Sequence, residues 1–306
     1  MRFQHTIWRW VRPLLLAMAA GIGVLGVWWF FVATWRGQMM DNQAYVGAEF
    51  GSNRVTPTFE SILENVSVTA IAAVMLAVAL TALVRRRWLL ALEAAAVVAC
   101  SNVTTRALKY HLLHRPGLVD YWGMTDNTYP SGHTTAAGSA MVAALLVAPR
   151  GLRSVVAVLG AGVMMVFGYG TVAARWHRPS DVVGAYLVCF AWAFFALFIA
   201  ALRQQLMARH QDELPERPRP SRLVPALMVL AGLAALGVAA ACGWAVRGTV
   251  DDFTEPWLLE QAVTSHPHLL VAYLGGSAGL CGVAMAGMGI LLRLVHLHDQ
   301  RSGRPL

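Results

Sequence analysis

Eight long apolar stretches run through the sequence, and they limit the folds open to the chain more than any other feature does. They cover residues 13–35, 62–84, 88–110, 133–149, 154–174, 180–202, 223–246 and 268–292. A helix needs roughly 20 apolar residues to cross a bilayer core of about 30 Å. We therefore expect an all-α, polytopic membrane bundle with about eight transmembrane helices.

The overall composition agrees with a membrane protein. Hydrophobic residues make up 57% of the 306 positions and charged residues 13%, whereas ordinary soluble proteins carry about 25% charged residues. This difference argues against a water-soluble globular enzyme. The 4 cysteines lie inside apolar stretches without paired spacing, so we expect them to pack as small hydrophobic residues, with no disulfide framework, metal site or cofactor.

The basic residues predict how the bundle is oriented. If the N-terminus is cytoplasmic, 16 of the 24 Lys and Arg residues lie on inner segments and 8 on outer segments, as the positive-inside rule requires. Both termini are then cytoplasmic in a multi-pass protein of the cell membrane. The first stretch extends to Trp35, which is too long for a cleaved signal peptide. Topology and anionic lipid account for the net charge of +8 without a nucleic-acid partner.

Five of the outer basic residues gather at two places, the end of the third stretch and the loop between the fifth and the sixth. They are Arg106, Lys109, Arg115, Arg175 and Arg178. Lys109 is the single lysine among the 24 Lys and Arg residues. Positive charge on the side that should be poor in it indicates an anion-binding site.

Two further polar clusters begin apolar stretches on the same outer side. Ser131 and Gly132 stand before the fourth stretch, where a serine can cap the helix and free N–H groups can cradle a phosphate. His133 follows them in the first turn. His177 and Asp181 lie four residues apart at the start of the sixth stretch. Asp181 there either caps the helix or orients the imidazole for attack or proton transfer.

The three clusters together have the composition that phosphoryl transfer without a metal needs. Cations and N–H groups can hold the phosphate oxygens, one histidine can attack phosphorus, and the other can protonate the leaving oxygen. Each cluster alone has an ordinary structural explanation. Their shared position on the outer side favours a catalytic role over these structural explanations.

These residues resemble the motifs of the type 2 phosphatidic acid phosphatase (PAP2) superfamily of lipid phosphate phosphatases. That family has Lys-x6-Arg-Pro, then Pro-Ser-Gly-His, then Ser-Arg-x5-His-x3-Asp. The second motif is complete at Pro130–His133, and the His-x3-Asp half of the third is complete at His177–Asp181. With the flanking helices, the resemblance covers about residues 13–202.

The resemblance implies a role for each of these residues. His177 would be the nucleophile that forms a phosphohistidine, Asp181 its orienting partner, and His133 the general acid for the leaving group. No metal is implied. The implied phosphate-binding residues are Lys109, Arg115, Ser131 and Gly132.

Two positions depart from the family pattern. Only five residues separate Lys109 from Arg115, so the arginine is displaced by about 100° if the segment stays helical. The arginine expected in the third motif falls at Thr171. Arg175 lies one helical turn later, and we expect it to supply the missing phosphate contact, with Arg178 as the competing candidate.

The sequence thus predicts a metal-independent membrane phosphatase that acts on a lipid phosphate or prenyl pyrophosphate at the extracytoplasmic face. Its expected parts are a six-helix catalytic domain at 1–202, a cytoplasmic linker at 203–222, and two further helices with a cytoplasmic tail at 223–306. Two alternatives stay open, a catalytically silent lipid-phosphate-binding protein and a phosphotransferase with an acceptor other than water. The outer loops 36–61 and 247–267 contain no recognisable chemistry.

Overall fold

The protein folds into helices in the part of the chain that its computed structural model describes, residues 2–49, 88–119, 127–207, 221–249 and 267–302. Within these ranges there are no strands, and the predicted all-α class is confirmed. The helices are α1 (Arg2–Val27), α2 (Trp35–Gly47), α5 (Trp88–Ala107), α6 (Gly132–Val147), α7 (Arg153–Ala173), α8 (Pro179–Met207), α9 (Leu223–Val246) and α11 (Pro267–Ser302). Short turns η1 (Trp28–Val32), η3 (Leu108–Leu112) and η4 (Arg150–Leu152) adjoin them.

Six of these helices are long and apolar enough to cross a membrane, as a multi-pass protein requires. α6 is shorter, with 16 residues, and the apolar stretch 62–84 lies outside the described residues. Large apolar side chains stay exposed on the bundle, for example Leu92 at 67% and Leu159 at 63%. Lipid tails are as apolar as these side chains, so the periphery of the bundle needs no polar coat.

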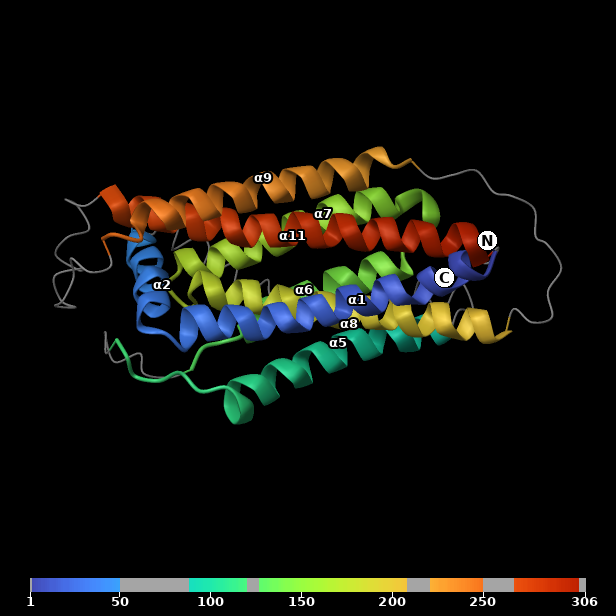
Figure 1. The fold of residues 1–306 in the computed structure, drawn as a ribbon, viewed down its shortest axis with the longest axis horizontal. Coiled ribbons are helices and arrows are strands. Elements are labelled where there is room, and N and C mark those ends of the chain that lie inside the picture. The colour runs from blue at the N-terminus through green and yellow to red at the C-terminus, as the bar shows by residue number, and fades with distance from the viewer. Residues whose placement is uncertain (1, 50–87, 120–126, 208–220, 250–266, 303–306) are drawn as a thin grey trace.

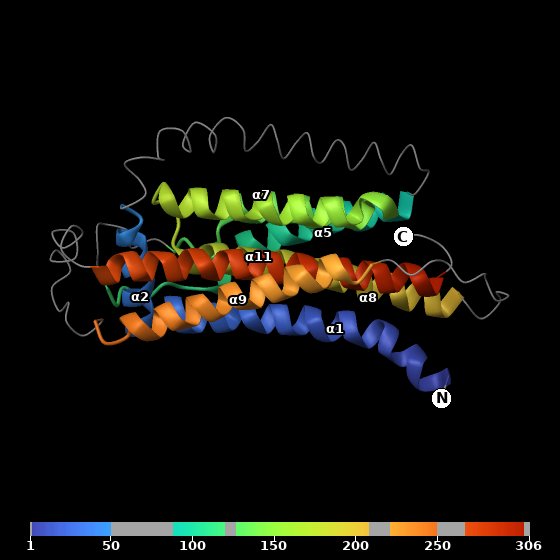
Figure 2. The same cartoon turned by 90° about the horizontal axis from the view of Figure 1, so that it is seen from above.

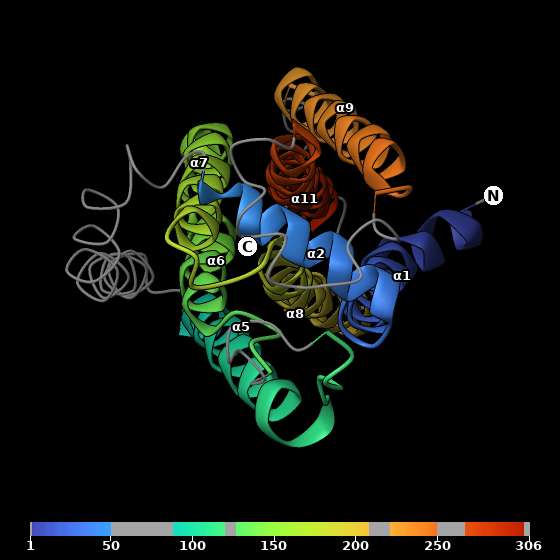
Figure 3. The ribbon, with the colours of Figure 1, turned by 90° about the vertical axis from the view of Figure 1, so that its left-hand side faces the viewer.

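The helices other than α2 run side by side along the long axis of the molecule (Figure 1). Seen from the end, α1, α5, α6 and α11 surround α8 (Figure 3). The view from above places α8 and α11 between α7 and α1 (Figure 2). Tyr186 and Phe190 of α8 are buried at this centre. A Cβ at Gly287 of α11 would lie 2.1 Å from the ring of Phe190, so a glycine is needed where α11 crosses α8.

α2 is an element that the sequence did not predict. α1 ends at Val27, earlier than expected, and the π turn η1 leads into a sharp reversal of the chain. Thr34 caps α2 by accepting the N–H of Gly37 at 3.1 Å. A Cβ at Gly37 would lie 1.8 Å from the carbonyl oxygen of Phe30, so only glycine permits this reversal. α2 consequently crosses the end of the bundle over α8 and α11 (Figures 1 and 3).

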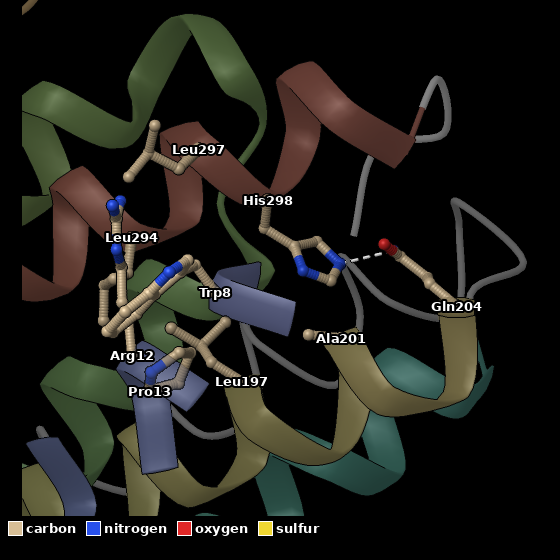
Figure 4. A pocket seen from close by; sticks show the side chains of 9 residues that line it. All are labelled: Trp8, Arg12, Pro13, Leu197, Ala201, Gln204, Leu294, Leu297 and His298. Atoms are coloured by element: carbon tan, nitrogen blue, oxygen red, sulfur yellow. Dashed lines mark hydrogen bonds between the residues drawn. The ribbon is translucent and has the colours of Figure 1, made fainter. Parts of the chain in front are cut away.

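The opposite end of the bundle holds the beginning of α1 and the end of α11 (Figure 1). There Trp8 and Arg12 of α1 and His298 of α11 line a cavity of about 40 Å³ (Figure 4). Gln204 of α8 and His298 share a hydrogen bond at this cavity. A cavity of this size has room for water and not for a lipid headgroup. The motif residues lie at the end that α2 crosses.

Candidate active site

The structure brings the three motif segments together at the α2 end of the bundle. The N–H of Ser131 donates to the carbonyl oxygen of Asp181 at 3.0 Å, which ties the second motif to the third. The side chain of Asn127 braces the first motif by donating to the carbonyl oxygens of Lys109 at 3.0 Å and Leu113 at 2.8 Å. Backbone groups of all three segments are therefore held in one hydrogen-bonded unit.

His177 and Asp181 form the buried centre of the site. Nδ1 of His177 lies 3.3 Å from Oδ2 of Asp181, and the same oxygen accepts the N–H of Arg178 at 3.0 Å. The His177 side chain is 7% exposed and that of Asp181 is fully buried. When Nδ1 donates to the carboxylate, Nε2 is the ring nitrogen that keeps its lone pair, as a nucleophile requires.

His133 approaches His177 from the first turn of α6. The centroids of the two imidazoles are 6.2 Å apart, and the ring of Trp176 lies 5.6 Å from that of His133. His133 is exposed, and Lys109 is close enough for its charge to act on it. The site thus pairs one buried and one open imidazole from separate motifs.

Ser131 is the N-cap of α6. Its hydroxyl accepts the N–H of Thr134 at 3.3 Å and donates to the Thr134 hydroxyl at 2.9 Å, and the side chain is fully buried. The start of a helix leaves its first N–H groups without intrahelical acceptors, and both Gly132 and His133 are exposed. The groups that can face an anion here are therefore backbone amides, while the Ser131 hydroxyl is engaged in the cap.

Lys109 lies in the π turn η3 at the end of α5. The chain leaves helical geometry at Leu113, whose φ and ψ are −110° and 132°. The displacement of about 100° that a continuous helix would impose between Lys109 and Arg115 therefore does not apply. The non-helical residues from Leu113 onward determine where Arg115 points.

Arg115 brings a positive charge into the buried part of the site. Its Nη1 and Nη2 are both buried without a hydrogen-bond partner among the described residues. Burial lowers the pKa of Arg115, and the nearby charge of Arg178 lowers it further. The carboxylates of Asp41 and Asp181 act in the opposite direction. A guanidinium with two unpaired nitrogens matches the geometry of a phosphate, which can accept both hydrogen bonds.

Thr171 occupies the position of the missing arginine and serves the backbone instead. It is fully buried, and its hydroxyl donates to the carbonyl oxygen of Gly168 at 2.9 Å. Its own carbonyl oxygen accepts the N–H groups of Trp176 at 2.9 Å and His177 at 3.1 Å. Thr171 thereby fixes the loop that carries His177.

Arg175 and Arg178 share one aromatic platform, the ring of Tyr45. Their guanidinium carbons lie 5.0 and 5.5 Å from its centroid, within the range of cation–π contacts. Arg175 is partly exposed, and its Nη1 lies 3.9 Å from Oε2 of Glu49. Arg178 is 4% exposed, and its Nε donates to Oδ1 of Asn42 at 2.7 Å. Arg175 thus lies at the rim of the site and Arg178 in its buried part.

Sequence reasoning missed the contribution of α2, which falls in a predicted outer loop without a motif. Four side chains on one face of this helix, spaced i, i+3, i+4 and i+7, each bond a different residue of the motif segments. The bonds join Gln38 to Pro116, Asp41 to Ser180, Asn42 to Arg178 and Tyr45 to Arg175. Polar residues at this helical spacing directly after an apolar stretch are the signal that could have found α2.

Asp41 of α2 is a buried carboxylate that lies against the start of α8. Its two oxygens accept the N–H of Ser180 at 3.2 Å and the Ser180 hydroxyl at 2.5 Å. Burial raises the pKa of Asp41 to about 6, and the charge of Asp181 adds to this effect. The hydrogen bond from Ser180 and the charges of Arg178 and Arg115 act against it. Asp41 thus satisfies an N–H group at a helix start from outside the helix.

The fold and the site define a polytopic helical membrane protein with His, Asp and Arg side chains gathered at one end of the bundle. Residues 90–205 match the family model of the PAP2 superfamily. The match is confined to this range of the chain, and over it the resemblance seen in the motifs is confirmed. Members of the superfamily are phosphatases, so the match indicates a membrane phosphatase. The searches of curated proteins and of solved structures gave no match.

The matched range begins in α5 and ends in α8, and it contains every site residue expected from the sequence. α1, α2, α9 and α11 lie outside it. α8 continues to Met207, beyond the predicted end of the catalytic domain at residue 202. The division into a catalytic domain, a linker and two further helices stays a prediction.

Proposed function

We propose that the protein hydrolyses a lipid phosphate or prenyl pyrophosphate at the extracytoplasmic face, without a metal, through a phosphohistidine. The observation that carries the proposal is the buried His177–Asp181 pair, with His133 beside it. The terminal nitrogens of Arg115, which have no partner among the described residues, supply positive charge nearby. Phosphoryl transfer depends mainly on a positioned nucleophile and on positive charge around the phosphoryl oxygens.

In the first proposed step, Nε2 of His177 attacks phosphorus while the bond from phosphorus to the leaving oxygen breaks. Asp181 holds the Nδ1–H and stabilises the positive charge that develops on the imidazole. His133 gives a proton to the leaving oxygen. In the second step, water attacks the phosphohistidine, His133 accepts the proton of the water, and inorganic phosphate leaves His177.

Cations and backbone amides would hold the phosphate oxygens during both steps. The proposed groups are the side chains of Lys109 and Arg115, the amides of Gly132 and His133, and Ser131 as the cap that fixes those amides. The sequence favours Arg175 as the third cation that binds phosphate. The burial of Arg178 makes it a competing candidate for this role. If Arg178→Ala abolishes turnover and Arg175→Ala leaves it intact, the assignment of Arg175 is wrong.

Release of inorganic phosphate by purified protein in EDTA tests the proposed function. The substrates are a prenyl pyrophosphate, phosphatidic acid and phosphatidylglycerophosphate in detergent. We expect release from at least one of them, and no release by His177→Ala. Because the arginine expected in the third motif is replaced by Thr171, a catalytically silent lipid-phosphate-binding protein is the second candidate function. Binding without release from any substrate would favour that candidate, and release only with an added acceptor would favour a phosphotransferase.

A further inference from the structure

A large cavity lies on the side of α8 that faces α1, α9 and α11, and its volume is about 410 Å³. Pockets for small molecules typically measure about 300–1,000 Å³. Among the described residues that line it, only Asp41 and Ser180 carry polar side chains. The lining from the other helices is represented by Val27, Phe31, Val183, Gly243 and Gly279.

The two polar side chains of the cavity are already paired with each other. The Ser180 hydroxyl donates to Asp41 at 2.5 Å, and the N–H of Ser180 donates to the same carboxylate. The other described residues of the lining offer no side-chain donor or acceptor to a ligand. Because burying a polar group without a partner is costly, the chemistry of this cavity selects a hydrocarbon.

The cavity adjoins the candidate active site. Ser180 precedes Asp181 in the chain, and Gln38, one turn before Asp41 on α2, donates to the carbonyl oxygen of Pro116, the residue after Arg115, at 2.8 Å. α2 contributes Met40 and Ala44 to the lining, and α9 contributes residues such as Leu236 and Gly243. Figure 3 shows α1 and α9 on the same side of the bundle, with α2 crossing near both. A chain attached to a group bound at Arg115 would therefore have an apolar space within reach.

We propose that this cavity holds the hydrocarbon chain of the lipid phosphate whose headgroup binds at His177. The proposal rests on the proposed function, and it gives the helices α9 and α11 a role in selecting the substrate by its chain. Lipid tails are as apolar as the cavity walls, so the hydrophobic effect does not drive this binding within a membrane. The gain comes from close packing of the chain and from the orientation that this packing gives to the headgroup.

Glycines on α9 allow a test with a matched control. A Cβ at Gly243 would meet only the Cε of Met40, at 3.5 Å, so a larger side chain is accommodated by the backbone and fills the cavity. A Cβ at Gly237 on the same helix meets nothing within 4 Å, and Gly237 does not line the cavity. Gly243→Leu and Gly237→Leu change the helix propensity of α9 equally, so a difference between the two variants reports on the cavity.

The measurement is the ratio of kcat/KM for hexadecyl phosphate to kcat/KM for butyl phosphate. For Gly243→Leu we expect this ratio to fall about tenfold, mainly through KM, since loss of a fitted methylene contact is worth about that much. Gly237→Leu should keep the wild-type ratio. An unchanged ratio in Gly243→Leu, or an equal fall in both variants, overturns the proposal. If the wild type hydrolyses neither compound nor any substrate in EDTA, the proposed function itself is rejected.

A second measurement tests the cavity without activity and without a variant. A hexadecyl phosphate with a photoreactive group at the end of its chain is bound to the wild-type protein and irradiated. We expect crosslinks in α9 and α11 at the cavity, near Gly243 and Gly279, and competition by unlabelled hexadecyl phosphate. Crosslinks confined to the outer surfaces of the bundle, or crosslinks that the competitor does not reduce, overturn the proposal even when hydrolysis is observed.

Discussion

At the scale of single residues, the site sets a hydrogen-bonded His–Asp pair beside a partly buried arginine. Asp181 is buried and accepts hydrogen bonds from His177 and from the N–H of Arg178. Arg115 has two buried terminal nitrogens without a hydrogen-bond partner among the described residues. A buried unpaired charge destabilises a protein unless a ligand pairs with it. Arg115 is therefore the residue at which stability and function should oppose each other.

We expect Arg115→Met to raise the melting temperature in detergent by a few degrees and to abolish most phosphatase activity. Inorganic phosphate should raise the melting temperature of the wild type, because it binds only the folded state, and should not raise that of the variant. Arg106→Met is the control, since Arg106 is exposed at the end of α5. A lower melting temperature in Arg115→Met, with an unchanged response to phosphate, would show that Arg115 is structural.

The buried carboxyl of Asp41 gives a prediction about pH. The pKa of Asp41 rises from 3.8 to about 6 on folding because of burial, so the folded protein holds this proton more tightly than the unfolded chain does. The resulting contribution to the free energy of unfolding is present below about pH 4 and is lost as the pH rises to about 6. The melting temperature of the wild type minus that of Asp41→Asn should fall over this interval and stay level above it. A difference that is constant or that grows with pH contradicts this.

At the scale of elements, α2 positions the loops that carry the charged groups. It lies across the end of the bundle (Figure 3) and bonds residues from the segment that follows η3 and from the α7–α8 connection. Removing the side chain of Asn42 leaves Nε of the buried Arg178 without its partner, at a cost typical of hydrogen bonds to charged groups. α2 thus affects the site by positioning Arg175 and Arg178, and it supplies none of the proposed reacting groups.

Asn42→Ala should lower kcat/KM by about tenfold to hundredfold, which corresponds to a lost hydrogen bond to a charged group. Gln43→Ala is the control on the same helix, because Gln43 bonds Thr249 at 3.4 Å and none of the motif residues. Asn42→Asp should keep the acceptor for Arg178 and restore most of the activity. Equal losses in Asn42→Ala and Gln43→Ala would mean that α2 only supports the fold.

The helices between α5 and α8 could be predicted because local signals define them. Pro116 follows the helix end, Ser131 caps α6, and the apolar stretches give the lengths of the helices. The role of α2 could not be predicted in the same way, because its bonds join residues 78 to 139 positions apart in the chain. The different surroundings of Arg175 and Arg178 also depend on such distant partners, Tyr45 and Asn42.

At the scale of the whole molecule, the two ends of the bundle differ in chemistry. The α2 end gathers the motif residues, and the other end holds the beginning of α1 and the end of α11 (Figure 1). The distribution of Lys and Arg predicts that the second end is cytoplasmic. A lipid phosphate in the outer leaflet would then reach the site without crossing the membrane.

Cysteine labelling of intact cells tests this orientation. In a background without the native cysteines, Trp35→Cys at the start of α2 should react with a membrane-impermeant maleimide. Leu206→Cys near the end of α8 should react only after lysis. Trp35 is 38% and Leu206 is 64% exposed, so neither side chain is buried within the bundle. The reverse pattern would place the site in the cytoplasm.

The central claim is that His177 becomes phosphorylated during turnover, and trapping the intermediate tests it most directly. Purified protein in EDTA is mixed with a radiolabelled prenyl pyrophosphate or lipid phosphate that it hydrolyses, quenched in alkali within one turnover, and mapped by peptide sequencing. We expect label on the peptide that contains His177, stable to alkali and lost in acid as an N–P bond requires, and no label in His177→Ala. Rapid turnover by the wild type without such label, or label on another residue, would contradict the account.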